Sequence, residues 1–450
     1  MSNRKLFGTD GIRGEANVYP MVSSVALKVG KALASIVQNK NGAAIVIGKD
    51  TRLSGYMLET ALVSGIVSMG VDVYLVGPMP TPAVAHLTRS MNADAGIMIT
   101  ASHNPAIDNG IKIFDSHGFK LPDEEEQLIE KLMFSDGIHD MMVSGTEIGK
   151  AYRLNEANGR YIEFAKSTIQ EMRFRGLKIV LDCANGAAYD VAPKVFRELG
   201  AEVVVLNNKP DGLNINLDCG AVHPENTARE VVKHNADLGI TLDGDADRLI
   251  ICDEKGEVLD GDYILTFCAH QMLKENRLRN NTLVITDYSN MGVDEGLRKV
   301  SGKVERTGNG DRYVIEAMRK GDFNLGGEAS GHMIFSDYVP TGDGVISALQ
   351  FLKLIKNAGI KVSEIRKYLT KNPQILDSFN VTDKVPFEEM PIVAAKIKEI
   401  EEKLKGQGRL LLRYSGTEKK CRIMIEGKDR EATESYVAEL AASIKEEIGA

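Results

Sequence analysis

Residues 95–105 read AGIMITASHNP, an apolar run that ends in a cluster of small polar side chains. The run is short and is bounded by turn-forming residues, so it predicts a buried β-strand over 95–99. This strand would place the hydroxyl of Ser102 in the turn at its carboxyl end, the edge at which open α/β sheets bind ligands. Taken alone, the segment also fits an ordinary turn, because Ser and Asn side chains bond to nearby backbone and Pro105 ends the strand.

The elements around this strand follow an order that returns twice along the chain. Apolar runs predict strands alternating with amphipathic helices over 43–99, and the same order recurs over 177–242 and 282–325. A glycine stands at the same helix-to-strand joint in each copy, at Gly70, Gly200 and Gly302. The pattern therefore favours a genuine threefold repeat and predicts three structurally similar mixed α/β domains.

The end of the chain has a different pattern. After Pro373 the apolar runs predict a strand, a helix, two strands and a helix, which is typical of a smaller α+β domain. The whole sequence is therefore expected to form four domains, over residues 1–153, 154–254, 255–371 and 372–450.

Chemically unusual residues stand at one corresponding place in each repeat. The equivalent strand ends in Ser102 in the first copy, and it runs into DGDADR (243–248) in the second and GGEASGH (326–332) in the third. Because corresponding loops of a repeat occupy equivalent positions, we expect the three domains to face a central cleft.

The second of these loops carries three carboxylates, Asp243, Asp245 and Asp247. On an extended segment, two-residue spacing would align them on one side, where they would repel one another unless a cation lay among them. Oxygen-only ligands favour Mg²⁺. The alternatives are a solvated acidic turn or a calcium loop, but an EF-hand would need a closing Glu and flanking helices.

Three further segments could serve phosphate or sugar chemistry. The RYSGT segment (413–417) offers a guanidinium, two hydroxyls and a flexible backbone that suit a phosphate, although an exposed turn would look similar. Glu328 and Ser330 could accept bonds from sugar hydroxyls, in what could also be a hairpin. Lys112 and Arg13 add cations near the serine. A hydroxyl nucleophile, a metal site and a phosphate-binding loop are together what phosphoryl transfer requires.

The composition limits which classes of partner and which cellular compartment fit the chain. The chain has 450 residues, with 43% hydrophobic and 26% charged residues and a net charge of −8, which argues against a general nucleic-acid partner. No apolar run reaches membrane-spanning length, and no signal-type segment follows the N-terminus. Five scattered cysteines without CxxC spacing suit reduced thiols. We expect a cytoplasmic protein without a membrane partner.

The four loops TASHNP, DGDADR, GGEASGH and RYSGTE closely resemble, in this order and over the whole chain, those of the α-D-phosphohexomutase superfamily. Within that superfamily, three further stretches resemble the bacterial enzymes that act on glucosamine phosphates: residues 7–14, 210–220 and 310–314.

The resemblance implies roles for individual residues. Ser102 would be a phosphoserine, and its phosphate would hold Mg²⁺ together with Asp243, Asp245 and Asp247. The catalytic positions implied are Arg13, Ser102, His103, Lys112 and Arg248. Those implied for substrate binding are Glu328, Ser330, His332, Arg413, Ser415, Gly416 and Thr417.

The reaction implied by the resemblance converts glucosamine 6-phosphate to glucosamine 1-phosphate through a bound 1,6-bisphosphate, and feeds UDP-N-acetylglucosamine synthesis. The partner would be a small phosphosugar, and a homodimer is possible. Three alternatives remain open: a phosphomannomutase or phosphoglucomutase, a metal-dependent phosphatase, and a silent phosphosugar sensor. A phosphatase would not need the 413–417 loop, and a sensor would be expected to lose Ser102 or an aspartate.

Overall fold

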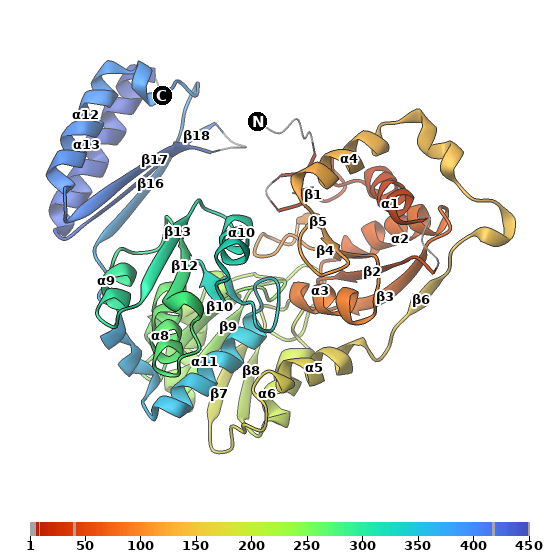
Figure 1. The fold of residues 1–450 in the computed structure, drawn as a ribbon, viewed down its shortest axis with the longest axis horizontal. Coiled ribbons are helices and arrows are strands. Elements are labelled where there is room, and N and C mark those ends of the chain that lie inside the picture. The colour runs from red at the N-terminus through yellow and green to blue at the C-terminus, as the bar shows by residue number, and fades with distance from the viewer. Residues whose placement is uncertain (1–5, 9, 39–41, 416–418, 449–450) are drawn as a thin grey trace. The chain divides into compact units, whose positions relative to one another are not determined.

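The computed structural model describes residues 6–8, 10–38, 42–415 and 419–448 (Figure 1). The chain forms two compact units. One comprises Met1–Tyr288 with Val300–Tyr368, and the other comprises Ser289–Lys299 with Leu369–Ala450. Each unit is described here by itself.

The first unit contains three sheets. The first has the order β1-β5-β4-β2-β3-β6, the second β11-β10-β9-β7-β8 and the third β13-β12-β14-β15. Their strands are β1 (Ile12–Glu15), β2 (Ala44–Lys49), β3 (Asp72–Pro78), β4 (Ala95–Ile99), β5 (Asp108–Asp115), β6 (Ala151–Arg153), β7 (Lys178–Asp182), β8 (Glu202–Leu206), β9 (Leu238–Leu242), β10 (Leu249–Asp253), β11 (Val258–Leu259), β12 (Thr282–Thr286), β13 (Lys303–Thr307), β14 (Leu325–Gly327) and β15 (Met333–Phe335).

Helices connect these strands and flank the sheets (Figure 1). They are α1 (Ser23–Val37), α2 (Gly55–Val67), α3 (Thr81–Ser90), α4 (Asp123–Met133), α5 (Ala157–Ser167), α6 (Val191–Glu198), α7 (Glu225–His234), α8 (Gly261–Lys274), α10 (Asp311–Gly321) and α11 (Gly344–Ala358). Short 3₁₀ helices lie at Asp136–Met141, Gly145–Glu147, Gly220–Val222, Arg279–Asn281 and Val362–Tyr368.

The three sheets share one internal topology. In each, a central strand pairs in parallel with two neighbours, and one of these neighbours pairs with an antiparallel strand: β5-β4-β2-β3, β10-β9-β7-β8 and β15-β14-β12-β13. This common order confirms the predicted threefold repeat and the mixed α/β class.

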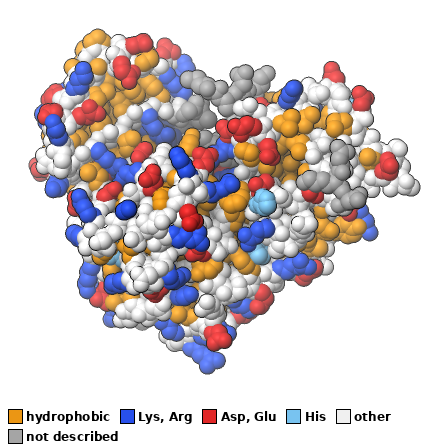
Figure 2. Space-filling model, viewed as in Figure 1, with side chains coloured by type: hydrophobic (Ala, Val, Ile, Leu, Met, Phe, Trp, Pro, Cys, Tyr) orange, Lys and Arg blue, Asp and Glu red, His pale blue; other side chains and the backbone are white. Residues whose placement is uncertain are grey.

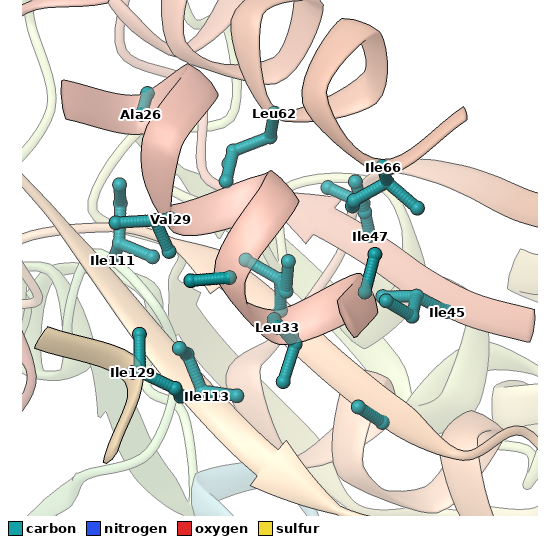
Figure 3. Packing of buried hydrophobic residues seen from close by; sticks show 14 of the residues in the cluster. Ala26, Val29, Leu33, Ile45, Ile47, Leu62, Ile66, Ile111, Ile113 and Ile129 are labelled. Carbon is teal, nitrogen blue, oxygen red and sulfur yellow. The ribbon is translucent and has the colours of Figure 1, made fainter. Parts of the chain in front are cut away.

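The core of the first repeat lies between its sheet and helices α1, α2 and α4. Every residue of β2 is buried, as expected for a strand covered on both faces. Side chains of α1 such as Val29 and Leu33 meet the isoleucines of β2 and β5 (Figure 3). Helices α1 and α2 approach closely at Gly30, where a Cβ would lie 2.5 Å from the carbonyl oxygen of Leu62. Close packing holds the sheet rigid and fixes the positions of its strand ends.

The second unit contains the antiparallel sheet β16-β18-β17, with helices α12 and α13 against it. Its elements are α9 (Gly292–Arg298), β16 (Gln374–Asn380), α12 (Pro391–Leu404), β17 (Gly408–Tyr414), β18 (Lys420–Gly427) and α13 (Arg430–Ile448), with a 3₁₀ helix at Phe387–Glu389. Buried Glu426 joins the Ser289–Lys299 segment to this sheet, because it accepts a 2.6 Å bond from the Met291 amide and pairs with Arg409 at 2.8 Å. The α+β class predicted for the end of the chain is confirmed.

Some elements differ from the sequence prediction. The strand expected at 323–325 begins at Leu325, because α10 ends with Asp322 in the left-handed conformation and the Phe323 amide still bonds to Met318. The antiparallel strands β5, β10 and β15 were not predicted. Lys112 interrupts the apolar pattern of β5, whereas β10 (LIICD) and β15 (MIF) are short apolar runs that follow directly on the loops of the site. No helix in the described part of the chain has the length and apolar character needed to cross a membrane.

Candidate active site

Ser102 lies in a tight turn immediately after β4. Its backbone φ is +53°, a left-handed conformation that costs a non-glycine residue about 1–3 kcal/mol and persists only where the surroundings impose it. The Ser102 amide donates to the hydroxyl of Thr100 at 2.9 Å, and the Ser102 residue is 2% exposed. The hydroxyl is therefore held in one place rather than left on a mobile surface turn.

Arg52, which follows β2, determines the shape of this turn. It is completely buried and donates to the carbonyl oxygens of Ser102 (3.0 Å) and Asn104 (2.9 Å). Its Nε donates at 2.7 Å to Asp50, which also accepts from Thr100. Neither Asp50 nor Arg52 was predicted from the sequence, although Lys49 of β2 stands beside Ile99 of β4 in register, so that both strands end at one edge.

The second repeat brings the aspartates to the same place. The Ser102 hydroxyl donates to Asp243 at 2.7 Å, and one ligand atom from each of Asp243, Asp245 and Asp247 lies within 4.8 Å of the others. All three side chains are buried. At Gly244 a Cβ would lie 2.5 Å from the Ser102 carbonyl oxygen, so a larger residue would force the two loops apart.

The expectation that an extended segment aligns the three carboxylates is wrong. The loop is a turn in which Ala246 has a φ of +57°, and α3 holds it from the first repeat. The amide of Thr81 donates to the Asp245 carbonyl at 2.9 Å, and its hydroxyl donates to the Asp245 carboxylate at 2.6 Å. The three carboxylates converge because the loop folds back on itself, and not because they alternate along a strand.

The three carboxylates fit a divalent metal ion. One oxygen of Asp245 and one of Asp247 are buried yet accept no hydrogen bond from any described residue. Burial and the neighbouring charges of Asp247 and Asp245 raise the pKa of Asp243 well above its usual range. A buried cluster with excess negative charge and spare oxygens is stabilised by a cation with several open coordination positions.

Lys112 of β5 partly compensates these charges. It is 2% exposed, and its Nζ lies 3.0 Å from Asp245 and 3.6 Å from Asp247. Burial alone would lower the pKa of Lys112, but the surrounding carboxylates outweigh burial and raise it. Lys112 therefore remains a cation and can stabilise a transferring phosphoryl group.

One other predicted residue contacts the serine, and two lie against nearby aspartates. The Nδ1 of His103 lies 3.3 Å from the Ser102 hydroxyl, and burial with the charges of Arg248 and Arg13 lowers the pKa of His103 to about 4. His103 is therefore neutral at pH 7 and binds a proton only weakly. Arg248 places its Nε 3.9 Å from Asp247, and Arg13 pairs with Asp10.

The third repeat contributes His332. Its Nδ1 lies 3.5 Å from Asp247 and its Nε2 lies 3.6 Å from Asp311. Burial would lower the pKa of His332, but the two carboxylates raise it to about 9. The Gly342 amide lies 3.2 Å from Nε2 and favours the neutral ring, yet two carboxylates outweigh one amide.

The same loop holds the residues predicted to bind sugar hydroxyls. Glu328 accepts bonds from the Gly310 amide at 3.2 Å and from the Ser330 hydroxyl at 3.1 Å. The loop is tied directly to the metal loop, because Leu249 donates to the Gly331 carbonyl at 2.9 Å. Loops of all three repeats therefore meet within the first unit.

The predicted phosphate-binding residues belong to the second unit. Arg413 lies in β17, and Ser415 follows that strand, with its amide donating to Lys420 at 2.8 Å. Gly416 and Thr417 lie outside the described residues. The contacts that join Ser102, the aspartates and His332 are all within the first unit.

Known proteins resemble the chain over its whole length. Models of the phosphoglucomutase/phosphomannomutase alpha/beta/alpha domains I, II and III match residues 4–138, 159–256 and 260–372, and that of the C-terminal domain matches 378–443. A phosphoglucosamine mutase from Geobacter sp. (strain M21) is 54% identical, and one from Geobacter metallireducens is 55% identical, each over 99% of both chains.

A solved structure shares the fold. A phosphoglucomutase/phosphomannomutase family protein from Burkholderia thailandensis superposes with a TM-score of 0.81 at 24% identity, covering 98% of this chain and 97% of its own. Since family models match in all four segments and relatives are more than half identical over nearly their full length, the chain belongs to the phosphoglucomutase/phosphomannomutase family and, within it, to the phosphoglucosamine mutase group of phosphosugar mutases.

Proposed function

We propose that the chain interconverts glucosamine 6-phosphate and glucosamine 1-phosphate through a phosphoserine at Ser102 and a bound 1,6-bisphosphate. The observation that carries this proposal is the 2.7 Å bond between the Ser102 hydroxyl and Asp243 inside a buried cluster of three carboxylates. A serine in that position can carry a phosphate beside a metal. The names of the relatives support glucosamine as the sugar.

In the first half-reaction, a hydroxyl oxygen of the sugar phosphate forms a bond to the phosphorus on Ser102 while the bond from phosphorus to the serine oxygen breaks. In the second half-reaction, Ser102 takes back the other phosphate. Lys112 and Arg248 would stabilise the charge on the transferring group. The proton that the attacking sugar hydroxyl loses ends on the serine oxygen, and neutral His103, 3.3 Å from that oxygen, would serve there as a hydrogen-bond partner rather than as the group that keeps the proton.

The metal is inferred to be Mg²⁺, because the donor set is entirely oxygen and no described His or Cys offers a softer ligand within the cluster. Asp243, Asp245 and Asp247 would hold it together with the phosphate on Ser102. When bound, Mg²⁺ would neutralise charge on the phosphoryl oxygens.

Glu328 and Ser330 would bind the sugar hydroxyls in the first unit. Arg413, Ser415, Gly416 and Thr417 would hold the phosphate that does not react. Because the bisphosphate must present each end in turn, the same loop would accept either the 1-phosphate or the 6-phosphate. The product would supply UDP-N-acetylglucosamine synthesis.

The expected setting is the cytoplasm, in keeping with five cysteines that are all buried and free. On the face in Figure 2, basic and acidic side chains are interspersed, which supports a small phosphosugar rather than a nucleic acid as partner. A homodimer remains a prediction that analytical ultracentrifugation would test.

A coupled assay tests the function against its alternatives. With Mg²⁺ and a trace of bisphosphate, glucosamine 6-phosphate should turn over with a higher kcat/KM than glucose 6-phosphate or mannose 6-phosphate. A preference for either of those sugars would instead show a phosphoglucomutase or phosphomannomutase. Stoichiometric release of inorganic phosphate would show a phosphatase, and no turnover of any sugar phosphate would fit a sensor.

A further inference from the structure

Six charged side chains form a closed ring of alternating sign beside the serine. Lys112 contacts Asp247 at 3.6 Å and Asp10 at 3.2 Å, and Asp247 contacts His332 at 3.5 Å. His332 lies 3.6 Å from Asp311. Lys120 closes the ring, because its Nζ pairs with both Asp10 and Asp311.

The ring contains side chains from all three repeats and includes one aspartate of the metal loop. Asp10, Lys112 and Lys120 come from the first repeat, Asp247 comes from the second, and Asp311 and His332 come from the third. Among the described residues, the ion pairs of Lys120 are with Asp10 and Asp311 and not with the three aspartates of the metal loop, so its effect on them passes through Asp10 and Asp311.

A second set of contacts fixes the same junction. Arg312, next to Asp311, pairs with Asp123 at the start of α4 and donates to the Leu121 carbonyl at 2.5 Å. Two cations therefore bind the N-terminus of α10 to residues 120–123. Lys120 of the first repeat pairs with Asp311, and Arg312 of the third repeat pairs with Asp123. Because these contacts fix the N-terminus of α10 close to residue 120, Lys120 stays paired with Asp10 and Asp311.

We propose that Lys120, by pairing with both Asp10 and Asp311, is a positioning residue that sets where Lys112 and His332 stand around Asp247. This role rests on the proposed function. Lys112 is nearly balanced between Asp245 at 3.0 Å and Asp10 at 3.2 Å. Without Lys120, Asp10 would attract Lys112 more strongly, and the Asp311 carboxylate would be left with His332, 3.6 Å away, as its partner in the ring. Lys112 would then move away from the aspartate cluster, and His332 would shift toward Asp311.

The consequence is a defect in phosphoryl transfer rather than in substrate affinity. Misplacing a charge-stabilising group slows the chemical step, whereas the residues proposed to bind sugar and distal phosphate are unchanged. Lys120→Met should therefore lower kcat by about tenfold or more, with KM changed by less than about threefold. Lys120→Arg should recover most of kcat, because a guanidinium can also bridge two carboxylates.

The experiment uses full-length enzyme carrying phosphate on Ser102 and measures single-turnover transfer to glucosamine 6-phosphate, alongside kcat and KM. The matched control is Lys166→Met, which removes a lysine that likewise bridges two carboxylates, Glu163 and Glu198, at 2.6 Å and 2.5 Å. Neither carboxylate belongs to the ring, so this control should transfer phosphate at the wild-type rate.

If Lys120→Met does not fold, as judged by circular dichroism, Lys120→Gln provides the second test, because its amide can still bond to a carboxylate but carries no charge, and it should slow transfer in the same sense. A wild-type transfer rate in a folded Lys120→Met or Lys120→Gln variant would overturn the positioning role alone. So would an arginine variant as slow as the methionine variant. Absence of any transfer from phosphorylated wild type would instead remove the proposed function and this role together.

Discussion

The two units carry their polar residues in contrasting surroundings. Around Ser102, the serine, Lys112, Arg52 and the aspartates are buried and bonded by residues from two or three repeats. In the last unit, β17 is half-buried along its whole length, and Arg413 stands beside Arg422 across the sheet. Reacting groups need fixed positions before charge develops. A strand such as β17, whose Arg413 is proposed to bind either phosphate of one intermediate, does not need such burial.

The most severe test of this contrast between the two units is removal of the Ser102 hydroxyl. Ser102→Ala should reduce mutase turnover by about 10⁴-fold or more, because no neighbouring group can carry the phosphate in its place. Intact-mass measurement should show a phosphate adduct on the wild-type protein and none on the variant. The fold should be retained, as measured by thermal unfolding. Undiminished turnover would exclude a covalent mechanism at this residue.

The next largest effect is expected at the metal cluster. Asp245→Asn removes one of three negative charges and should lower kcat about 10²-fold while weakening Mg²⁺ binding, so that added Mg²⁺ partly restores activity. The wild-type protein should lose activity in EDTA and regain it when Mg²⁺ is added. Asp237→Asn, an exposed carboxylate outside the cluster, serves as the control. Activity that is indifferent to EDTA would contradict the metal assignment.

A third prediction distinguishes the structural role of Arg52 in the Ser102 turn from a role in the chemical step. Arg52→Met leaves Asp50 buried without its cation and should lower the free energy of unfolding by about 3–5 kcal/mol, measured in urea. It should also slow formation of the phosphoserine, because the Ser102 and Asn104 carbonyls lose their donor. Arg160→Met, which removes an exposed ion pair, should change stability by less than about 1 kcal/mol. Equal effects of the two substitutions would show that Arg52 is not structurally special.

The meeting of Ser102 and the three aspartates was predictable although they are far apart in sequence, because they occupy corresponding places in two repeats. They stand immediately after strands with clear apolar runs, so their place in the repeat could be predicted. Arg52 and Lys120 could not, because each looks like an ordinary charged residue after a strand or in a turn. Their importance comes from contacts with residues distant in the sequence, such as the bond from Arg52 to Ser102 and that from Lys120 to Asp311.

The geometry of the metal loop could not be predicted from the sequence either. Alternation of Asp with small residues is compatible with an extended segment, and only contact with α3 reveals a turn, since Thr81 bonds to both the carbonyl and the carboxylate of Asp245. The antiparallel strand β5 was missed for a related reason. Lys112 interrupts the apolar pattern of β5 because that strand carries a site residue as well as part of the core.

The smallest of the expected effects concerns the loop of the last unit. Arg413 can bind a phosphate with two parallel hydrogen bonds, and because the half-buried side chain is partly solvated we take the value of one charge-assisted bond, about 1.5–3 kcal/mol, for the pair. Arg413→Ala should therefore raise KM by about 10- to 100-fold and let the 1,6-bisphosphate leave before it presents its other end. Ser102 and the aspartates are unchanged, so the phosphoserine should still form.

Single turnover of phosphorylated Arg413→Ala, with quantification of the bisphosphate released to solution, measures this directly. The wild-type enzyme should retain nearly all of the intermediate, and Arg422→Ala, on the neighbouring strand, shows what loss of any cation from this sheet does. Retention and KM at wild-type values in Arg413→Ala would show that this loop does not hold phosphate. The contrast between the buried residues around Ser102 and the half-buried strand β17 would then lose its functional meaning, because the residues that react and those that bind the substrate would both have to lie in the first unit.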